Sequence, residues 1–424
     1  MIEIIGYITS TTLIAISLLL LTRGYVAAAP ILAVALMCLN ACLSANQIIY
    51  SRFAIFWSEM GAVHNSTQNI AYFVFILVSM TLVFWLANPK SLKTDGARDL
   101  LASVGKSRIA AQLSLAVLAV SALHFLSVDT LSIVRSEQYL FLNSFETLRF
   151  RNALTELIHT SRNHIGILSF LLFALAIAGR NKRLIFALGL SSTWFLVLAL
   201  ANHSRYAFLF LCVLGFILYF YRRTGAAIIS GLFAVLFLLA ALYGRSSGVH
   251  GLVGIPSSLF GAFATTDFSR IEFAYTNFFE GVYTQAEAFY YTNAEFASIY
   301  KTLSFSPFPS FIDGFSANAV HLQIRLHTFV PMGATGEVVV FGWQYLIAYW
   351  LAYLYAFFLT IKLLNRGMIY IGIAALVLLL YCTFVQFSYP VRWVFRFYVL
   401  IIGMYWFIGF ARPFLKGRAR ALLS

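Results

Sequence analysis

Two histidines and an arginine lie close together in the segment HLQIRLH, at His321, Arg325 and His327. A helix would place His321 and Arg325 on one face because they are four residues apart, and a strand would place all three on one side. Arg325 would repel a divalent cation, and no carboxylate follows before Glu337, so an anion suits the group better than a metal ion. Arginine binds phosphate oxygens in pairs, and histidine can move a proton near neutral pH. The alternative is that these residues are exposed on a loop.

The segment NHSRY is a short polar break between two apolar runs, and it contains Arg205. An arginine at membrane level costs about 2.5 to 3.5 kcal/mol on insertion scales, so snorkelling, pairing or a ligand must compensate. One interpretation is that Asn202 or Ser204 caps the following helix while Arg205 reaches the lipid headgroups. The other is that Arg205 binds an anion, and His203 is then expected to be an interfacial residue.

A second break of this kind, SYPVRWVFR, carries Arg392 and Arg396 on either side of Trp393. Pro390 strengthens this break because proline does not fit inside a continuous helix. Both arginines could anchor the next span at the lipid interface beside the tryptophan. A binding role is expected only if Arg392 and Arg396 converge with Arg205 and the other candidates.

The stretch from Asp267 to Thr302 combines eleven Phe or Tyr with five acidic residues, and its apolar residues recur at helical spacing. Aromatic rings stacked on sugars, with carboxylates accepting hydroxyl protons, would have this composition. A helix lying at the lipid boundary over the bundle would have it equally well. The substrate-binding candidates of the surrounding loop are Arg270, Glu280, Asp313 and His327.

The elements that must position these residues are membrane helices. Hydrophobic residues make up 61% of the chain and charged residues only 10%, which indicates an all-α integral membrane protein with many spans. The first apolar run lacks a basic leader, so it is expected to be an uncleaved helix. All four cysteines lie inside apolar runs, which makes disulfides and metal sites improbable. The interiors of the expected spans are almost free of charge, and His124 is the main exception.

Eleven runs are long enough to cross the membrane, within a range of ten to twelve. They start near residues 4, 25, 68, 109, 164, 184, 206, 226, 343, 368 and 394. If all cross, one side collects 17 of the 29 Lys and Arg but 2 of the 15 acids, so this side is expected to be cytoplasmic. The net charge of +14 thus reflects topology, not nucleic-acid binding. The amino terminus is then outside, unless the short run from Ile48 to Trp57 also crosses.

Three parts follow along the chain. Residues 1–243 hold spans 1 to 8 with an outward loop at 129–163, residues 244–342 form a large periplasmic loop, and residues 343–424 hold spans 9 to 11 and a basic cytoplasmic tail. The long outward loops predict that the protein carries out its function on the outer face of the membrane. No GxxxxGK[ST] phosphate-binding loop occurs, so a reaction would have to be driven by its own substrate.

The chain resembles the bacterial O-antigen polymerases of the Wzy type, and the related O-antigen ligases. The resemblance rests on the many spans, the large late outward loop, the pair Ser204-Arg205 and the segment TGEVVVFGW at Thr335 to Trp343. The shared arrangement of spans and loops extends over most of the chain, whereas the shared sequence motifs comprise only about 30 residues. The asparagine and tyrosine that ligases carry after the loop histidine are replaced by Leu322-Gln323 after His321, which disfavours a ligase.

The resemblance implies a glycosyltransferase of the GT-C-like class in the bacterial inner membrane, with its active site facing the periplasm. It would use no metal, nucleotide or other cofactor. The expected substrate is an oligosaccharide linked to undecaprenyl diphosphate, and the reaction extends polysaccharide for lipopolysaccharide biosynthesis. Membrane lipid and a chain-length regulator protein are the expected partners, and no nucleic acid is expected.

Within this hypothesis the arginines Arg205, Arg325, Arg392 and Arg396 bind the departing diphosphate, since stabilising charge on a leaving group is commonly the largest catalytic effect. His321 is the first candidate for the base and Glu337 the second, because burial or neighbours can tune either towards neutral pH. Glu337 could instead cap or orient the start of the next helix. The alternative functions are an O-antigen ligase and a transporter or flippase of lipid-linked sugars.

Overall fold

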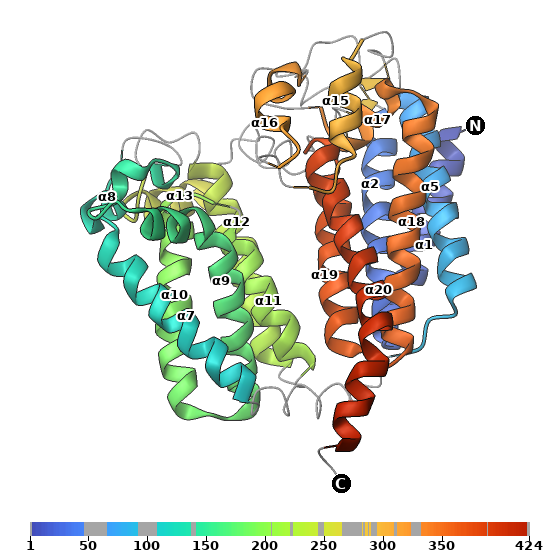
Figure 1. Ribbon diagram of the computed structural model, residues 1–424. Helices are drawn as coiled ribbons and strands as arrows, with labels where there is room; N and C mark the ends of the chain where they lie inside the picture. Colours follow the sequence, from blue (N-terminus) through green and yellow to red (C-terminus); the bar gives the residue numbers. More distant parts are fainter. Residues whose placement is uncertain are drawn as a thin grey trace. The chain divides into compact units, whose positions relative to one another are not determined.

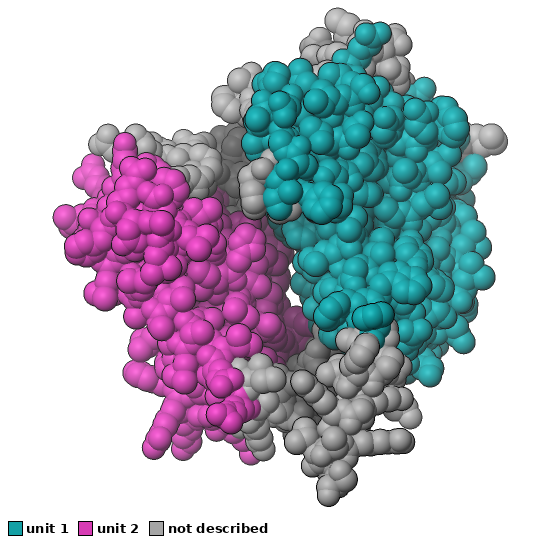
Figure 2. Space-filling view, in the orientation of Figure 1, with its two compact units in different colours: residues 1–92, 278–424 teal, residues 93–277 magenta. Residues whose placement is uncertain are grey.

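The computed structural model consists of α-helices and short 3-10 helices over the residues it describes. These are residues 2–45, 66–91, 108–136, 141–204, 206–220, 224–244, 250–264, 282, 285–286, 288–289, 295–308, 312–323, 332–387 and 389–421. The chain divides into two compact units, residues 1–92 with 278–424 and residues 93–277 (Figure 2). The first unit therefore joins the two ends of the chain.

Unit 1 contains the helices of both chain ends and those from the later part of the predicted large loop, after residue 278 (Figure 1). Its helices are α1 (Ile2–Thr22), η1 (Val26–Ala28), α2 (Ala29–Ala45), α5 (Ser66–Ala87), α15 (Ser298–Ser304), α16 (Phe315–Asn318), η5 (Val320–Leu322), α17 (Ala334–Phe341), α18 (Trp343–Asn365), α19 (Ile369–Val385) and α20 (Val391–Ala421). Helix α18 packs against α5, α19 and α20, so helices from the carboxy-terminal part of the chain pack against one from the amino-terminal part. The short helices α15, α16 and α17 gather at the end of this unit where α20 begins (Figure 1).

Unit 2 is a bundle of five longer helices with short elements at one end (Figure 1). Its elements are α7 (Arg108–Ser127), α8 (Thr130–Val134), η3 (Phe141–Asn143), η4 (Phe145–Thr147), α9 (Ala153–Gly179), α10 (Lys182–Ala201), α11 (Tyr206–Phe220), α12 (Thr224–Gly244) and α13 (Gly254–Ala264). Helix α9 packs against α7, α10 and α11 and is central to the unit.

Among the described residues, eight helices are long and apolar enough to cross a membrane: α1, α2 with η1, α5, α7, α9, α10, α18 and α20. Three shorter apolar helices, α11, α12 and α19, lie at the remaining expected positions. The all-α membrane fold is confirmed at this level. The count of eleven spans stays a prediction.

Helix α9 begins eleven residues before the expected span start near residue 164, at Ala153. Its start is fixed by a capping box, in which the Asn152 side chain accepts from the Thr155 amide at 2.9 Å and Thr155 accepts from the Asn152 amide at 3.0 Å. The described helix therefore takes in most of the polar segment that the sequence assigned to the end of the loop at 129–163. This shift moves His159 and Arg162 onto a helix, where both are buried.

Candidate functional site

The start of α20 is joined to the predicted outward loop by the buried carboxyl group of Glu337. This side chain is 0% exposed. Its Oε1 accepts a hydrogen bond from the Tyr300 hydroxyl at 2.7 Å, and its Oε2 accepts one from the Val391 amide, also at 2.7 Å. Because Val391 is the first residue of α20, Glu337 satisfies one of the amides that a helix start leaves unpaired. A carboxyl group on α17 therefore links α15 to α20.

Burial raises the pKa of Glu337 to about 8, although the hydrogen bonds from Tyr300 and Val391 act in the opposite direction. A carboxyl group with such a pKa is mostly protonated at pH 7. It can exchange a proton within the physiological range, but it has no contact with solvent in this structure.

Two backbone hydrogen bonds fix the start of helix α17 to the turn before α20, and they thereby set the position of Glu337. The Ala334 amide donates to the Tyr389 carbonyl at 2.7 Å, and the Thr335 amide donates to the Gln386 carbonyl at 3.2 Å. A Cβ atom at Gly333 would lie only 2.2 Å from the carbonyl oxygen of Phe387, so no larger residue fits there without movement. The small residues of PMGATGEV thus permit the close approach that brings the carboxyl group to Val391.

Arg392, one residue further along α20, forms a buried ion pair with Asp313. Its Nη2 lies 2.7 Å from both carboxylate oxygens, and the two side chains are 5% and 9% exposed. The same guanidinium donates to the carbonyls of Leu303 and Phe308 and stands 4.1 Å from the centre of the Phe315 ring. Burial is the largest single influence on the pKa of Asp313 and would raise it. The hydrogen bonds from Arg392, Ser306 and the Phe315 amide, together with the charge of Arg392, outweigh burial and lower this pKa to about 2.

Asp313 is positioned by the tight turn that begins α16. Gly314 adopts φ +71°, which only glycine tolerates readily, and the Phe315 amide donates to Asp313 Oδ1 at 3.1 Å. The Arg396 guanidinium, one turn further along α20, donates to the Phe308 carbonyl. Leu303, Phe308 and Asp313 are therefore fastened to the first two turns of α20.

The structure brings together four of the predicted site residues at this end of unit 1: Glu337, Arg392, Arg396 and Asp313. The fifth described candidate, His321, lies exposed on η5. Arg205, Arg270, Glu280, Arg325 and His327 lie outside the described residues, and their roles stay predictions. Sequence reasoning did not single out Tyr300, because one tyrosine among eleven aromatic residues carries no distinguishing signal.

Arg392 and Asp313 were predicted to contact substrate, and the structure shows each of them bound to the other. An arginine that already has a carboxylate and two carbonyl partners holds the loop in place. Glu337 likewise orients the start of a helix, as its second interpretation proposed, but that helix is α20 and not the neighbouring α18. Diphosphate binding by Arg392 and catalysis by Glu337 stay predictions.

Unit 2 contains a second buried polar group, built around two histidines. The Trp194 indole donates to His124 Nδ1 at 3.2 Å, His124 Nε2 lies 3.2 Å from His159 Nδ1, and His159 Nε2 lies 2.7 Å from the Leu142 carbonyl. Trp194 can only donate, so neutral His124 carries its proton on Nε2, and the same reasoning places the proton of neutral His159 on Nε2. The chain of hydrogen bonds therefore has one direction, from α10 to η3.

His203, which the sequence suggested as an interfacial residue, has a buried side chain. It is 1% exposed, adopts the left-handed φ of +48° and packs edge to face against His250, with 5.2 Å between ring centres. The Asn202 side chain accepts from the Leu142 amide at 3.2 Å, so the NHSRY turn is linked to the histidine chain through Leu142.

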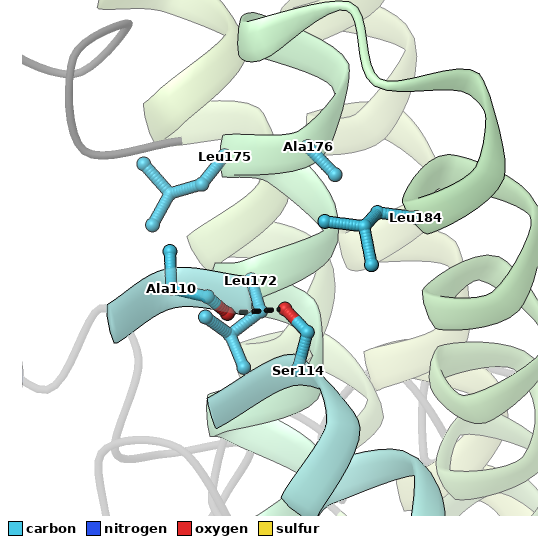
Figure 3. Close-up of a pocket in the computed structure, with 6 residues that line it drawn as sticks. All are labelled: Ala110, Ser114, Leu172, Leu175, Ala176 and Leu184. Carbon is cyan, nitrogen blue, oxygen red and sulfur yellow. Dashed lines mark hydrogen bonds between the residues drawn. The ribbon is translucent and has the colours of Figure 1, made fainter. Parts of the chain in front are cut away.

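Figure 3 shows a small hollow in unit 2, lined by Ala110, Ser114, Leu172, Leu175, Ala176 and Leu184. Its only hydroxyl group, that of Ser114, donates within its own helix to the Ala110 carbonyl at 2.7 Å. The remaining lining is aliphatic, so the hollow offers no group for catalysis.

Comparison of the chain with protein-family models, with curated proteins and with solved structures gives no match. The helices and their composition define a multi-pass helical membrane protein.

Proposed function

We propose that this chain is a glycosyltransferase that polymerises lipid-linked oligosaccharide repeat units. It would transfer the growing glycan from undecaprenyl diphosphate to the non-reducing end of a new lipid-linked unit on the periplasmic face. The observation that carries the proposal is the fastening of the predicted outward loop over the start of α20, through Asp313, Arg392 and Arg396. A membrane-anchored anionic donor needs such a place, where a structured loop meets cations at the end of a span.

In this reaction the acceptor hydroxyl attacks the anomeric carbon, the bond from that carbon to the diphosphate oxygen breaks, and undecaprenyl diphosphate leaves with the bonding electron pair. The hydroxyl proton passes to His321, whose exposed position on η5 makes it accessible to substrate. Arg205, Arg325 and Arg396 stabilise the charge on the diphosphate. Glu337 and the pair of Asp313 with Arg392 keep α15, α16 and α17 aligned with α20.

The experiment is a glycan ladder assay on membranes that carry Arg205→Ala, Arg325→Ala or His321→Ala, with expression checked. The proposed site predicts loss of long chains in all three. Arg205→Lys should also fail, because lysine cannot replace the two parallel hydrogen bonds of a guanidinium. His164→Ala, which changes an exposed histidine of α9, is the matched control and should retain the full ladder. Normal ladders from all three alanine variants would refute the site.

A transporter of lipid-linked sugars is the second candidate, and unit 2 contains the observation that favours it. Arg162, His159 and His124 are buried on α7 and α9, two helices that are long and apolar enough to cross a membrane. The hydroxyl groups of Ser121, Ser169, Ser191 and Ser192 join in a buried chain with separations of 2.6 to 3.0 Å. Polar residues inside spans often mark a substrate path. Turnover by purified protein separates the candidates, because a transporter would leave the glycan length unchanged.

A further inference from the structure

Four uncharged polar side chains are buried in unit 1, two on α5, one on α18 and one at the described residue Gln285. Gln285 is 1% exposed, Asn69 3%, Trp350 4% and Tyr72 8%. We name this group the amide–aromatic cluster. Figure 1 shows α5 and α18 side by side in this unit, and the two helices are in contact.

In the sequence, Gln285 lies between two residues that contact α5, Val282 and Phe289. The Asn69 amide nitrogen donates to the Val282 carbonyl at 3.2 Å, and the Tyr72 ring lies 5.9 Å from the Phe289 ring. Val282 and Phe289 are three and four residues from Gln285, and the Phe289 amide donates to the Gln285 carbonyl at 3.4 Å. Spacings of three and four residues fall on one face of a helical turn, so we expect Gln285 on the same face as Val282 and Phe289, the two residues that contact α5.

Several polar atoms of the cluster lack the partners that buried groups require. Both polar atoms of the Gln285 side chain and Oδ1 of Asn69 have no hydrogen-bond partner among the described residues. Leaving such a group unsatisfied costs about 1 to 3 kcal/mol, and more than nine in ten buried polar groups avoid it. A bound polar molecule would remove this cost.

The chemistry of the cluster selects the kind of molecule. Among the described residues, it offers two amide acceptors and an amide donor and no formal charge, so hydroxyl groups, which both donate and accept, match it better than an ion. Beside the amides, the Tyr72 and Trp350 rings stand edge to face with 5.3 Å between their centres. Amides that bind hydroxyl groups, next to aromatic rings that cover C–H surfaces, are suited to a sugar.

The cluster adjoins the helix that carries Glu337. A Cβ atom on Gly336 would lie 2.9 Å from the Cβ of Ala288, so α17 directly contacts the residues that hold Gln285. Residue 336 precedes Glu337, and the cluster is therefore next to the site at the start of α20.

From these contacts we infer that the amide–aromatic cluster is a saccharide subsite, in which Gln285 and Asn69 bind the hydroxyl groups of one sugar of the glycan and Tyr72 or Trp350 covers its C–H face. This inference rests on the proposed function for its biological ligand, but sugar binding can be measured without turnover.

The experiment is saturation-transfer NMR on the full-length purified chain with glucose, galactose, rhamnose and N-acetylglucosamine, each at millimolar concentration. At least one sugar should receive saturation from the protein. Gln285→Met and Asn69→Leu should weaken binding of that sugar by about tenfold, which corresponds to about 1.4 kcal/mol. Gln112→Met, which changes an exposed glutamine of α7, should bind like the unchanged chain.

Gln285→Met should fold, because replacing an unpartnered buried amide by an apolar group of similar size removes no side-chain hydrogen bond. Asn69→Leu loses the hydrogen bond to the Val282 carbonyl and should be less stable than Gln285→Met. If the cluster holds only buried water, Gln285→Met will be as stable as the unchanged chain or more stable, and neither variant will change sugar binding. That result, or no saturation of any sugar, would overturn the subsite. Binding that depends on Gln285 in a protein without polymerase turnover would retain the subsite and refute the proposed function.

Discussion

The carboxyl group of Glu337 is flanked by two uncharged donors, the Tyr300 hydroxyl and the Val391 amide, and is closed off from solvent. Its pKa of about 8 lies above the ordinary value of 4.5, so the folded protein favours the protonated form. The resulting stability is fully present below pH 4.5 and is lost as the pH rises to about 8.

Glu337→Gln should therefore remove this pH dependence, because glutamine is neutral throughout and retains an oxygen for the Val391 amide. We expect the Tm of the unchanged protein to fall relative to that of Glu337→Gln between pH 5 and pH 8, a range of about three pH units set by the shift in pKa. Thermal unfolding of both proteins across this range measures the difference. Parallel curves would show that Glu337 is ionised in the folded state.

Asp313→Asn should cost about 3 to 5 kcal/mol of unfolding free energy, because it leaves the buried Arg392 guanidinium without its counter-charge. The comparison is Asp129→Asn, which breaks the more exposed pair with Arg149 and should cost at most about 1 kcal/mol. Denaturation in detergent micelles measures both. Equal losses would mean that the pair of Asp313 and Arg392 does not fasten the loop.

The sequence identified several of the residues at the start of α20 but not their partners. An arginine at membrane level can be recognised from the sequence as a candidate site residue, because inserting its charge into a membrane is costly in any protein. Both Arg392 and Arg396 lie near a helix start, as predicted. The pairing with Asp313 joins residues 79 positions apart and depends on the folded loop. Side chains such as Tyr300 and Gln285 gain importance only from burial beside particular neighbours, which composition does not reveal.

Helix α9 shows why a helix can begin before the apolar run that marks its span. Its first turns carry Glu156, His159, Arg162 and His164, a pattern that hydropathy assigns to a loop. The capping box at Asn152 and Thr155 starts the helix there, and burial against α7 and η3 provides hydrogen-bond partners for His159. Local capping and tertiary contact together outweigh average hydropathy.

The histidine chain between α7, α9 and α10 should stabilise unit 2. His159→Leu removes the partners of His124 Nε2 and of the Leu142 carbonyl, so we expect a loss of roughly 1 to 3 kcal/mol. His164→Leu, at an exposed position on the same helix, should change stability little. Chemical denaturation compares the two variants. If His159→Leu were as stable as His164→Leu, the histidine chain would not contribute to the fold.

The whole molecule combines two units that the order of spans along the chain did not suggest. Hydropathy locates the apolar helices, because a span needs a run of about 20 apolar residues whatever its partners. It does not say that residues 1–92 pack with residues 278–424, since such contacts depend on the shapes of facing side chains. The general membrane fold is thus readable from the sequence, while the grouping of its helices is not.

The predicted topology places η4 outside and the turn between α9 and α10 inside. Glu146→Cys and Lys182→Cys introduce thiols at exposed positions of these two elements, in a chain whose native cysteines are mostly buried. An impermeant maleimide should label Glu146→Cys in intact spheroplasts and Lys182→Cys only after permeabilisation, with the unchanged chain as background. The reverse pattern would invert the orientation of unit 2.

The central claim is that the protein lengthens glycans with energy from its own lipid-linked substrate. The direct measurement uses purified protein in liposomes, with an undecaprenyl-diphosphate-linked repeat unit and no nucleotide. We predict a ladder of products that differ by one repeat unit, together with release of undecaprenyl diphosphate, and neither product with His321→Ala. Movement of the repeat unit across the bilayer without any change in its length would contradict the account and identify a transporter.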